Sequence, residues 1–333
     1  MADLKPPSQS LPAASADVLI RHATLRQLQL LEAIVRLGSF TRAAEELFLT
    51  QPTVSMQIKK LAEAVGMPLF QQVGRCVEPT DAGREVYAAC RTVLRTLSDL
   101  EGRLSDLQGL KRGRLRLGVV TTAKYFVPEV LGAFCERYPG IDVALKVSNR
   151  ERILDRLADA EDDLYIIGQP GETGNVDAIP FAPNPLVVVA RSDHPRARER
   201  GIPFARIAEE QFILREPGSG VRDTMLKRFA AHGLTPRVRL ELGSNEAIKH
   251  AILGGLGISV MSLHSLTLEA ASGRLVLLDV EGFPIERMWY LAYSRSRELC
   301  LVARTFLSFA VDHEPEIRAV LNETNRALRR VAD

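Results

Sequence analysis

Apolar side chains recur at helical spacing in three consecutive stretches near the beginning of the chain. Residues 24–37, 40–49 and 50–66 each place apolar residues three or four positions apart, which is typical of a helix with one buried face. Thr50 is suited to cap the third helix, and Pro52 falls in its first turn, where the missing N–H costs little. The pattern predicts three short helices that pack together.

The third of these helices is expected to present a polar face. Val54, Ile58 and Leu61 are expected to face inward. Glutamine can bond bidentately to adenine, threonine and serine can reach bases or phosphates, and lysine neutralises phosphates. In a helix-turn-helix, the N-terminal residues of the second helix of the motif meet the base edges. The residues predicted to bind DNA are Arg42, Thr50, Gln51, Pro52, Thr53, Ser55, Gln57, Lys59, Lys60 and Arg75. The alternative is a polar helix face that is only solvated.

A β-wing is predicted directly after the third helix. In residues 68–80, two short strand-like pieces flank Gly74 and Arg75. An arginine at the tip of a wing suits the narrow minor groove or its phosphates. An ordinary exposed arginine in a hairpin is the alternative.

A long helix with a heptad seam follows. Residues 81–108 contain no proline, and their apolar positions alternate between steps of four and three. The seam residues are Val86, Cys90, Val93, Leu97, Leu100, Leu104 and Leu107. A narrow seam needs a partner helix, and the same helix of a second subunit would place two reading heads on a palindromic site. Burial of the seam against the chain's own body is the alternative. Arg112, Gly113 and Arg114 are expected to form the hinge that ends this helix.

From residue 114 onward, predicted strands alternate with predicted helices, which favours a mostly parallel sheet. The predicted strands are 114–120, 141–147, 164–168, 185–191, 212–216, 238–243, 257–262 and 288–295. The predicted helices are 125–139, 150–160, 221–233, 245–255 and 300–312.

Ligands of such sheets lie beyond the carboxyl ends of the strands, near the N-termini of helices. The residues predicted to bind an effector there are Thr121, Thr122, Asn149, Gln169, Arg215, Ser219, Arg222, Ser244 and Asn245. Hydroxyls, exposed N–H groups and two arginines favour an anionic small molecule. Each residue alone could equally serve as a helix cap, as Asn149 and Ser244 illustrate.

Composition and charge narrow the function classes. A chain of 333 residues suits two or three compact units, and a net charge of +2 means that any DNA binding must come from locally placed charge. We expect no cofactor, no metal site and no catalysis, because the four cysteines are scattered and the six histidines have no metal-ligand spacing. The absence of a long apolar run and of a secretory signal favours a cytoplasmic protein that makes no contact with a membrane.

Taken in order, these parts resemble the LysR-type transcriptional regulators. Residues 25–70 (LRQLQLLEAIVRLGSFTRAAEELFLTQPTVSMQIKKLAEAVGMPLF) carry the likeness most specifically. A narrower resemblance, to the CbbR-like branch that controls carbon-fixation operons, lies in VVTTAKYFVPEVLGAFCERYPGI, VSNRERILDRLADAEDDLYIIGQP and REPGSGVRDTM. The resemblance implies operator contacts by Gln51, Thr53 and Ser55, a wing position for Arg75, and an effector cleft between two lobes of periplasmic-binding-protein type.

The resemblance also implies further partners and a domain plan. It implies an activator of a Calvin-cycle (RuBisCO) operon, a phosphorylated or redox-linked metabolite as effector, a homotetramer built as a dimer of dimers, and RNA polymerase as a further partner. The expected parts are a flexible tail (1–20), a winged helix-turn-helix (21–80), a dimerisation helix and hinge (81–112), a first effector lobe (113–168 and 290–312), a second effector lobe (169–289) and a C-terminal tail helix (313–333).

Two alternatives to this function remain. One is a LysR-type regulator of a different metabolic operon. The other is a solute-binding protein or an enzyme that uses the α/β lobes. A solute-binding protein would need an export signal and an enzyme would need a reactive cluster, and neither is found in the sequence. A gel shift with the upstream intergenic DNA separates these classes.

Overall fold

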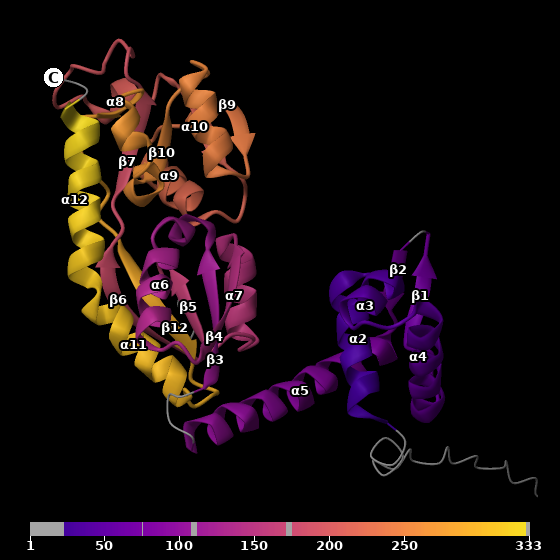
Figure 1. The fold of residues 1–333 in the computed structure, drawn as a ribbon. Coiled ribbons are helices and arrows are strands. Elements are labelled where there is room, and N and C mark those ends of the chain that lie inside the picture. The colour runs from indigo at the N-terminus through magenta and orange to yellow at the C-terminus, as the bar shows by residue number, and fades with distance from the viewer. Residues whose placement is uncertain (1–22, 75, 108–111, 171–174, 331–333) are drawn as a thin grey trace, which may run out of the picture. The chain divides into compact units, whose positions relative to one another are not determined.

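The computed structural model describes residues 23–74, 76–107, 112–170 and 175–330 (Figure 1). The chain divides into two compact units, Met1–Glu101 and Gly102–Asp333. The predicted tail over residues 1–20 and the wing residue Arg75 lie outside the described residues.

The first unit is a three-helix bundle followed by a hairpin and a long helix. Its elements are α2 (Leu25–Leu37), α3 (Phe40–Glu46), α4 (Gln51–Val65), β1 (Phe70–Val73), β2 (Cys76–Pro79) and α5 (Asp81–Leu107). The Thr50 hydroxyl accepts a hydrogen bond from the N–H of Thr53, which caps α4 as the sequence predicts. The second helix ends earlier than predicted, because Phe48 has a left-handed backbone (φ 55°) that no α-helix accommodates. These helices enclose a core that contains Leu31, Val54 and Leu61.

The heptad seam of α5 divides into two parts. Val86 and Cys90 pack into the core of the first unit, where Cys90 is 1% exposed and its thiol donates to the carbonyl of Leu28. The first unit therefore covers Cys90 and covers Val86 in part, so Cys90 has little surface left for a dimer interface. The next seam residues are exposed, namely Val93, Leu97, Leu100 and Leu104. The side chain of Leu107 lies outside the part of the chain that the structure describes.

The second unit consists of two lobes, each with a sheet and its own core. The first lobe has a five-stranded sheet in the order β4-β3-β5-β12-β6. Its strands are β3 (Gly113–Val120), β4 (Ile141–Ser148), β5 (Leu164–Ile167), β6 (Val176–Pro183) and β12 (Met288–Ser294). Its helices are α6 (Val127–Arg137), α7 (Arg150–Ala158) and α11 (Leu301–Asp312), and the 3-10 helix η1 (Thr121–Tyr125) follows β3.

The second lobe has a three-stranded sheet in the order β10-β7-β11 and a β8-β9 pair. Its strands are β7 (Leu186–Arg191), β8 (Gln211–Arg215), β9 (Arg237–Leu242), β10 (Ser259–Ser262) and β11 (Leu275–Leu278). Its helices are α8 (Phe204–Ile207), α9 (Gly220–Ala231) and α10 (Asn245–Leu253), with the 3-10 helices η2 (Leu263–Leu266) and η3 (Glu269–Ser272).

The sheets differ from the mostly parallel arrangement that the sequence predicts. The pairs β3-β4, β3-β5 and β8-β9 are parallel, but β12 runs antiparallel to β5 and β6, and β7 runs antiparallel to β10 and β11. The lobe boundaries also differ, because β6 and the first residues of β12 belong to the sheet of the first lobe. The sequence predicts the crossings between the lobes at residues 169 and 290. In the structure the chain leaves the first lobe after β6 and returns to it at β12.

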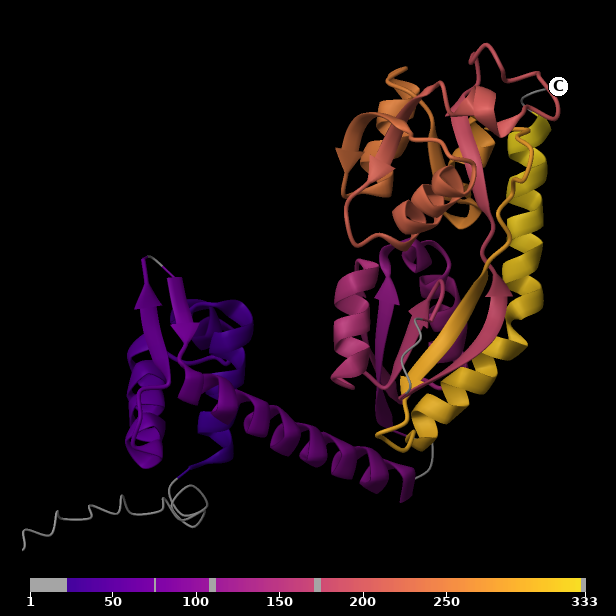
Figure 2. The same cartoon turned by 180° about the vertical axis from the view of Figure 1, so that it is seen from behind.

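The C-terminal helix α12 (Glu314–Arg330) is not a free tail. Both ribbon views show it running along the two lobes of the second unit (Figures 1 and 2). Its apolar residues Ile317, Leu321 and Leu328 are buried.

Candidate functional site

The polar face of α4 is exposed in the first unit. Gln51, Pro52, Met56, Lys59 and Lys60 are its most exposed residues through residue 60. The N-terminal end of this helix is accessible, which is the geometry that a recognition helix needs.

Not every predicted DNA-binding residue is equally free on this surface. Thr53 and Ser55 are half-buried, and the Ser55 hydroxyl accepts a hydrogen bond from Gln51 Nε2 at 3.0 Å. Gln57 Oε1 accepts a bond from Gln27 Nε2 at 3.2 Å, which ties this side chain to α2. The guanidinium of Arg42 donates to the carbonyl of Leu37 at 2.6 Å.

Sequence reasoning missed Met56 on this face. Its side chain is 50% exposed between the polar positions of α4. A methionine offers an apolar surface to the methyl group of thymine, so this residue adds an apolar element to a surface otherwise suited to hydrogen bonding. Its place on the outward side of the predicted helix was the signal that could have found it.

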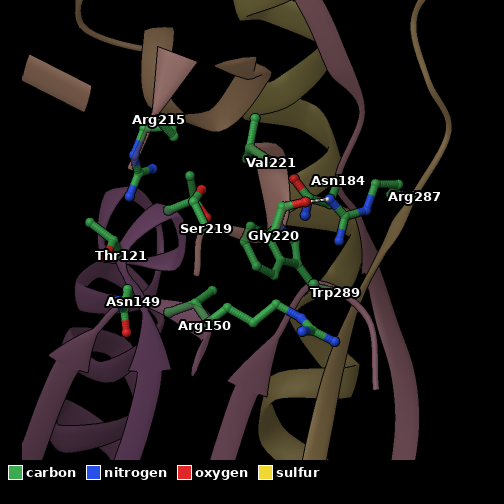
Figure 3. A pocket seen from close by; sticks show the side chains of 13 residues that line it. Thr121, Asn149, Arg150, Asn184, Arg215, Ser219, Gly220, Val221, Arg287 and Trp289 are labelled. Carbon is green, nitrogen blue, oxygen red and sulfur yellow. Dashed lines mark hydrogen bonds between the residues drawn. The ribbon is translucent and has the colours of Figure 1, made fainter. Parts of the chain in front are cut away.

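In the second unit, a pocket lies between the two lobes (Figure 3). It has a cavity volume of about 30 Å³. Residues from both lobes and from the two segments that join them line the pocket. They are Val120, Thr121, Thr122, Asn149, Arg150, Gly168, Asn184, Arg215, Ser219, Gly220, Val221, Arg287 and Trp289.

Five of the nine predicted effector residues line this pocket, and they follow the carboxyl ends of strands or begin helices. They are Thr121, Thr122, Asn149, Arg215 and Ser219. Asn149 also caps α7 by accepting from the N–H of Arg152, so one side chain serves both roles that its position predicts.

The other four predicted residues lie outside the lining of the pocket. Arg222 pairs with Glu241 at 2.7 Å. Asn245 is buried, and its Oδ1 accepts from the guanidinium of Arg215 at 2.8 Å, so it supports a residue that lines the pocket. Gln169 accepts a bond from Arg150 through its main-chain carbonyl, and Ser244 precedes α10.

Two arginines that the sequence analysis did not select dominate the pocket. Arg150 begins α7, and Arg287 immediately precedes β12. Glycines allow both side chains to lie against the backbone. A Cβ at Gly168 would come within 2.9 Å of Arg287 Nη2, and a Cβ at Gly220 within 2.8 Å of Arg150 Cδ. Arg150 was identifiable as the neighbour of Asn149, whereas Arg287 follows no predicted strand and carries no such signal.

The three arginines of the pocket differ in whether a carboxylate pairs with them. Arg215 forms a bidentate pair with Glu216, at 2.7 and 2.8 Å. Arg150 and Arg287 form no ion pair with any residue that the structure describes, and Arg287 donates only to the neutral oxygens of Gly220 and Thr224. Burial, and then the nearby positive charge of Arg150, lower the pKa of Arg287. The pocket therefore holds two arginines without an ion-pair partner among the described residues, and the carboxylate of Asp223 offsets the charge of Arg287 only in part.

Two buried donors at the pocket also lack an acceptor. Within the described residues, neither the indole Nε1 of Trp289 nor Nε of Arg287 has a hydrogen-bond partner. Unmade bonds of buried donors are costly, and an anion with several oxygens would satisfy them. The geometry is therefore suited to bind a small anion.

Metal sites and membrane spans can be judged for the described part of the chain. It contains no group of histidine, cysteine, aspartate or glutamate residues arranged to hold a metal ion. Within the same residues, no helix combines the length and apolar character that a membrane span requires.

Comparisons with known proteins agree with this architecture. Residues 25–84 match the family model described as "Bacterial regulatory helix-turn-helix protein, lysR family", and residues 108–315 match the "LysR substrate binding domain". The transcriptional activator CmpR of Synechocystis sp. is 48% identical over 298 residues, which are 90% of this chain and 98% of that protein. A RuBisCO operon transcriptional regulator of Acidithiobacillus ferrooxidans is 48% identical over 290 residues, covering 87% and 94% of the two chains.

Solved structures extend the comparison. The regulatory domain of Synechocystis CcmR, in complex with 2-PG, is 50% identical, with a TM-score of 0.59, over 61% of this chain and 98% of that one. Full-length CbnR in complex with its target DNA is 17% identical, with a TM-score of 0.63, over 88% and 99% of the chains, and this likeness concerns the fold alone. The family models cover both units and describe regulators, not enzymes. The chain therefore belongs to the LysR family of transcriptional regulators.

Proposed function

We propose that this regulator activates a carbon-fixation operon in response to a phosphorylated, carboxylate-bearing metabolite that binds between its effector lobes. The target is proposed from the relatives, because CmpR and the RuBisCO operon regulator are each 48% identical over nearly the whole chain. A LysR-type regulator of a different metabolic operon is the second candidate.

The observation that carries the effector proposal is the presence of two arginines in the pocket that form no ion pair within the described residues. Arg150 and Arg287 have no carboxylate partner among the described residues, and the indole N–H of Trp289 has no acceptor there. A phosphate group accepts bidentate bonds from a guanidinium and neutralises charge at the same time. The related CcmR domain was solved in complex with 2-PG, which makes 2-phosphoglycolate the first effector to test.

On DNA, we assign base reading to the N-terminal part of α4. Gln51 is exposed where a recognition helix enters the major groove, and Lys59 and Lys60 are exposed further along the same helix for the phosphates. Met56 supplies an apolar contact for a thymine methyl group.

For self-association, we assign the dimer contact to the exposed part of α5. Val93, Leu97, Leu100 and Leu104 continue the heptad spacing beyond the residues that the first unit covers. A second copy of the helix would bury them and place two copies of α4 on a two-fold symmetric operator. The family resemblance extends this dimer to a tetramer.

The effector half of the proposal is tested by calorimetric titration of the full-length chain. 2-Phosphoglycolate should bind, whereas glycolate and inorganic phosphate, which each lack one of its two anionic groups, should bind far more weakly. Arg287→Gln should lose the binding, and Lys227→Gln, at an exposed residue of α9 outside the pocket, should retain it. Equal binding of all three compounds, or an unaffected Arg287→Gln variant, would contradict the site.

The DNA half is tested by footprinting on the intergenic DNA beside the RuBisCO genes of the source organism. We expect a protected palindromic site whose bending changes on addition of 2-phosphoglycolate, since a ligand shifts an equilibrium only by its different affinity for the two states. If that DNA is protected but its bending responds to no phosphorylated metabolite, the proposed operator binding stands and the proposed effector response is wrong. Protection only beside other operons would favour the second candidate.

A further inference from the structure

One face of the C-terminal helix α12 packs against both lobes of the second unit. Its buried residues Ile317, Leu321, Thr324 and Leu328 are spaced by four, three and four positions, which places them on one face. Ile317 belongs to the hydrophobic core of the first lobe, whereas Leu321 and Leu328 belong to a core of the second lobe. The ribbon views show the same course, with α12 extending beside both lobes (Figures 1 and 2).

Both ends of α12 are held. At its beginning, α12 follows α11, which packs in the first lobe, and the ring of His313 between the two helices stacks on Phe309 at 4.2 Å. At its far end, Arg329 lies 3.7 Å from Asp279, which follows β11 of the second lobe. The helix is thus attached to each lobe by apolar packing and to the second lobe by an ion pair as well.

Between these attachments, α12 passes the two segments that join the lobes. Residues 183–186 and 284–287 pair with each other, since the N–H of Asn184 donates to the carbonyl of Arg287 at 2.7 Å and Leu186 pairs with Ile285. A groove of about 230 Å³ separates them from the helix, with Pro183, Pro185, Pro284 and Leu321 in its lining. Asn184 and Arg287 also line the effector pocket, so the hinge, the pocket and α12 adjoin one another.

We propose that α12 is a brace across the hinge, which holds the lobes in an arrangement with little room for a ligand and so weakens effector binding. An α-helix is stiff, and Ile317 and Leu328 are about 16 Å apart along its axis. Rotation of one lobe against the other must therefore remove one of these side chains from its core.

The size of the pocket links the restriction of lobe rotation to effector affinity. Because this cavity is small, about 30 Å³, we expect a phosphorylated acid to bind best when the lobes or the side chains move to widen it. When the competent arrangement is only partly populated, the apparent affinity falls by that fraction. The match to the family model ends at residue 315, close to the first residue of α12. The effect of the brace on effector affinity rests on the proposed effector site.

The test loosens one attachment at a time in the full-length chain. Leu328→Ala releases the helix from the second lobe, and Ile317→Ala releases it from the first. Val320→Ala is the matched control, because Val320 is on the same helix but 38% exposed. Fluorophores placed by codon suppression at Glu129 on α6 and Lys227 on α9, both exposed, report the distance between the lobes without ligand. Calorimetry with 2-phosphoglycolate reports the affinity, and thermal unfolding shows that each variant is folded.

Both attachment variants should broaden the distance distribution and bind 2-phosphoglycolate more tightly, by about tenfold, although they are less stable. Val320→Ala should change neither quantity. Unchanged distances in Leu328→Ala and Ile317→Ala would overturn the brace, and so would weaker binding in both. If 2-phosphoglycolate binds no variant, the proposed effector is wrong, and the distances without ligand still decide the brace: broadening supports it and an unchanged distribution refutes it.

Discussion

The DNA-reading face of α4 and the pocket between the effector lobes are built in opposite ways. Gln51, Met56, Lys59 and Lys60 come from a single helix within ten positions of the sequence, and all are exposed. The pocket combines residues from position 120 to position 289, and its polar side chains include the buried Arg215 and Ser219. One site is a surface in a single stretch of chain, and the other is assembled by the fold.

The difference bears on how function and stability are connected in each site. An exposed side chain can be removed at little cost to folding, because nothing packs against it. A buried, unbalanced charge such as Arg287 opposes folding until a ligand neutralises it. We therefore expect substitutions on the helical surfaces to affect binding alone, and substitutions in the pocket to change binding and stability in opposite directions.

The largest effect is expected on self-association through the surface of α5, which, like the face of α4, lies within a single stretch of the chain. Leu97→Glu combined with Leu100→Glu should weaken self-association at least about 1000-fold, since four buried leucines per dimer each contribute about 1.5–3 kcal/mol. Sedimentation equilibrium measures the change. The thermal midpoint of the first unit should hold, because both side chains are exposed in the single chain. Arg103→Glu, an exposed residue outside the seam, is the control, and an unchanged oligomeric state in the double variant would remove the seam as the interface.

In the pocket, Arg287→Met should weaken 2-phosphoglycolate binding by about 2–3 kcal/mol, the contribution of charged hydrogen bonds. The same substitution should raise the thermal midpoint without ligand, because it removes a desolvated charge beside Arg150. Calorimetry and thermal unfolding on one sample give both numbers. Lys227→Ala, at an exposed residue of α9 outside the pocket, should change either quantity by less than about 1 kcal/mol. A lower thermal midpoint for Arg287→Met would contradict the expectation that a substitution in the pocket weakens binding and raises stability.

The same difference decides how much of each site was predictable from sequence. Caps and helical spacing are local signals, so α2, α4 and the exposed polar positions of α4 could be predicted directly. Met56 lies on the same exposed face but was not among the residues predicted to bind DNA. Strand ends are also local, which is why Thr121, Asn149 and Arg215 were found.

The pocket residues on the two segments that join the lobes could not be predicted from the local sequence. Asn184 and Arg287 lie on the joining segments, and their place depends on β6 and β12 pairing in the first lobe. Nor could spacing alone show that Cys90 belongs to the first unit, because a heptad seam does not state which surface covers it. Ile317 and Leu328 likewise share one helical stripe but enter different cores.

Acid pH should lower the free energy of unfolding of the second unit through His264. This ring is buried against Phe126, its Nε2 lies 2.9 Å from the carbonyl of Pro183, and burial lowers its pKa to about 4. Between pH 6.5 and about 4 the unfolded chain binds a proton that the folded chain does not, so stability is full above pH 6.5 and falls with pH across this window. The loss should reach about 3 kcal/mol. Denaturant unfolding from pH 4.5 to 7.5 measures it, and His264→Gln should flatten that part of the profile. Equal slopes for both proteins would show that His264 titrates normally.

The smallest effect is expected on the surface of α4, where Gln51→Ala should cost about 1–3 kcal/mol of operator binding. The expected reason is loss of a bond to a base edge, so the change should appear on the operator and not on random DNA. Lys60→Ala is the contrasting variant, because loss of a phosphate contact weakens binding to both DNAs and lowers the salt dependence. Neither substitution should move the thermal midpoint, since both side chains are exposed. Gel shifts on the two DNAs at fixed salt measure the difference. An equal loss on both by Gln51→Ala would assign Gln51 to the backbone, and a lowered midpoint would mean that even an exposed recognition surface is coupled to folding.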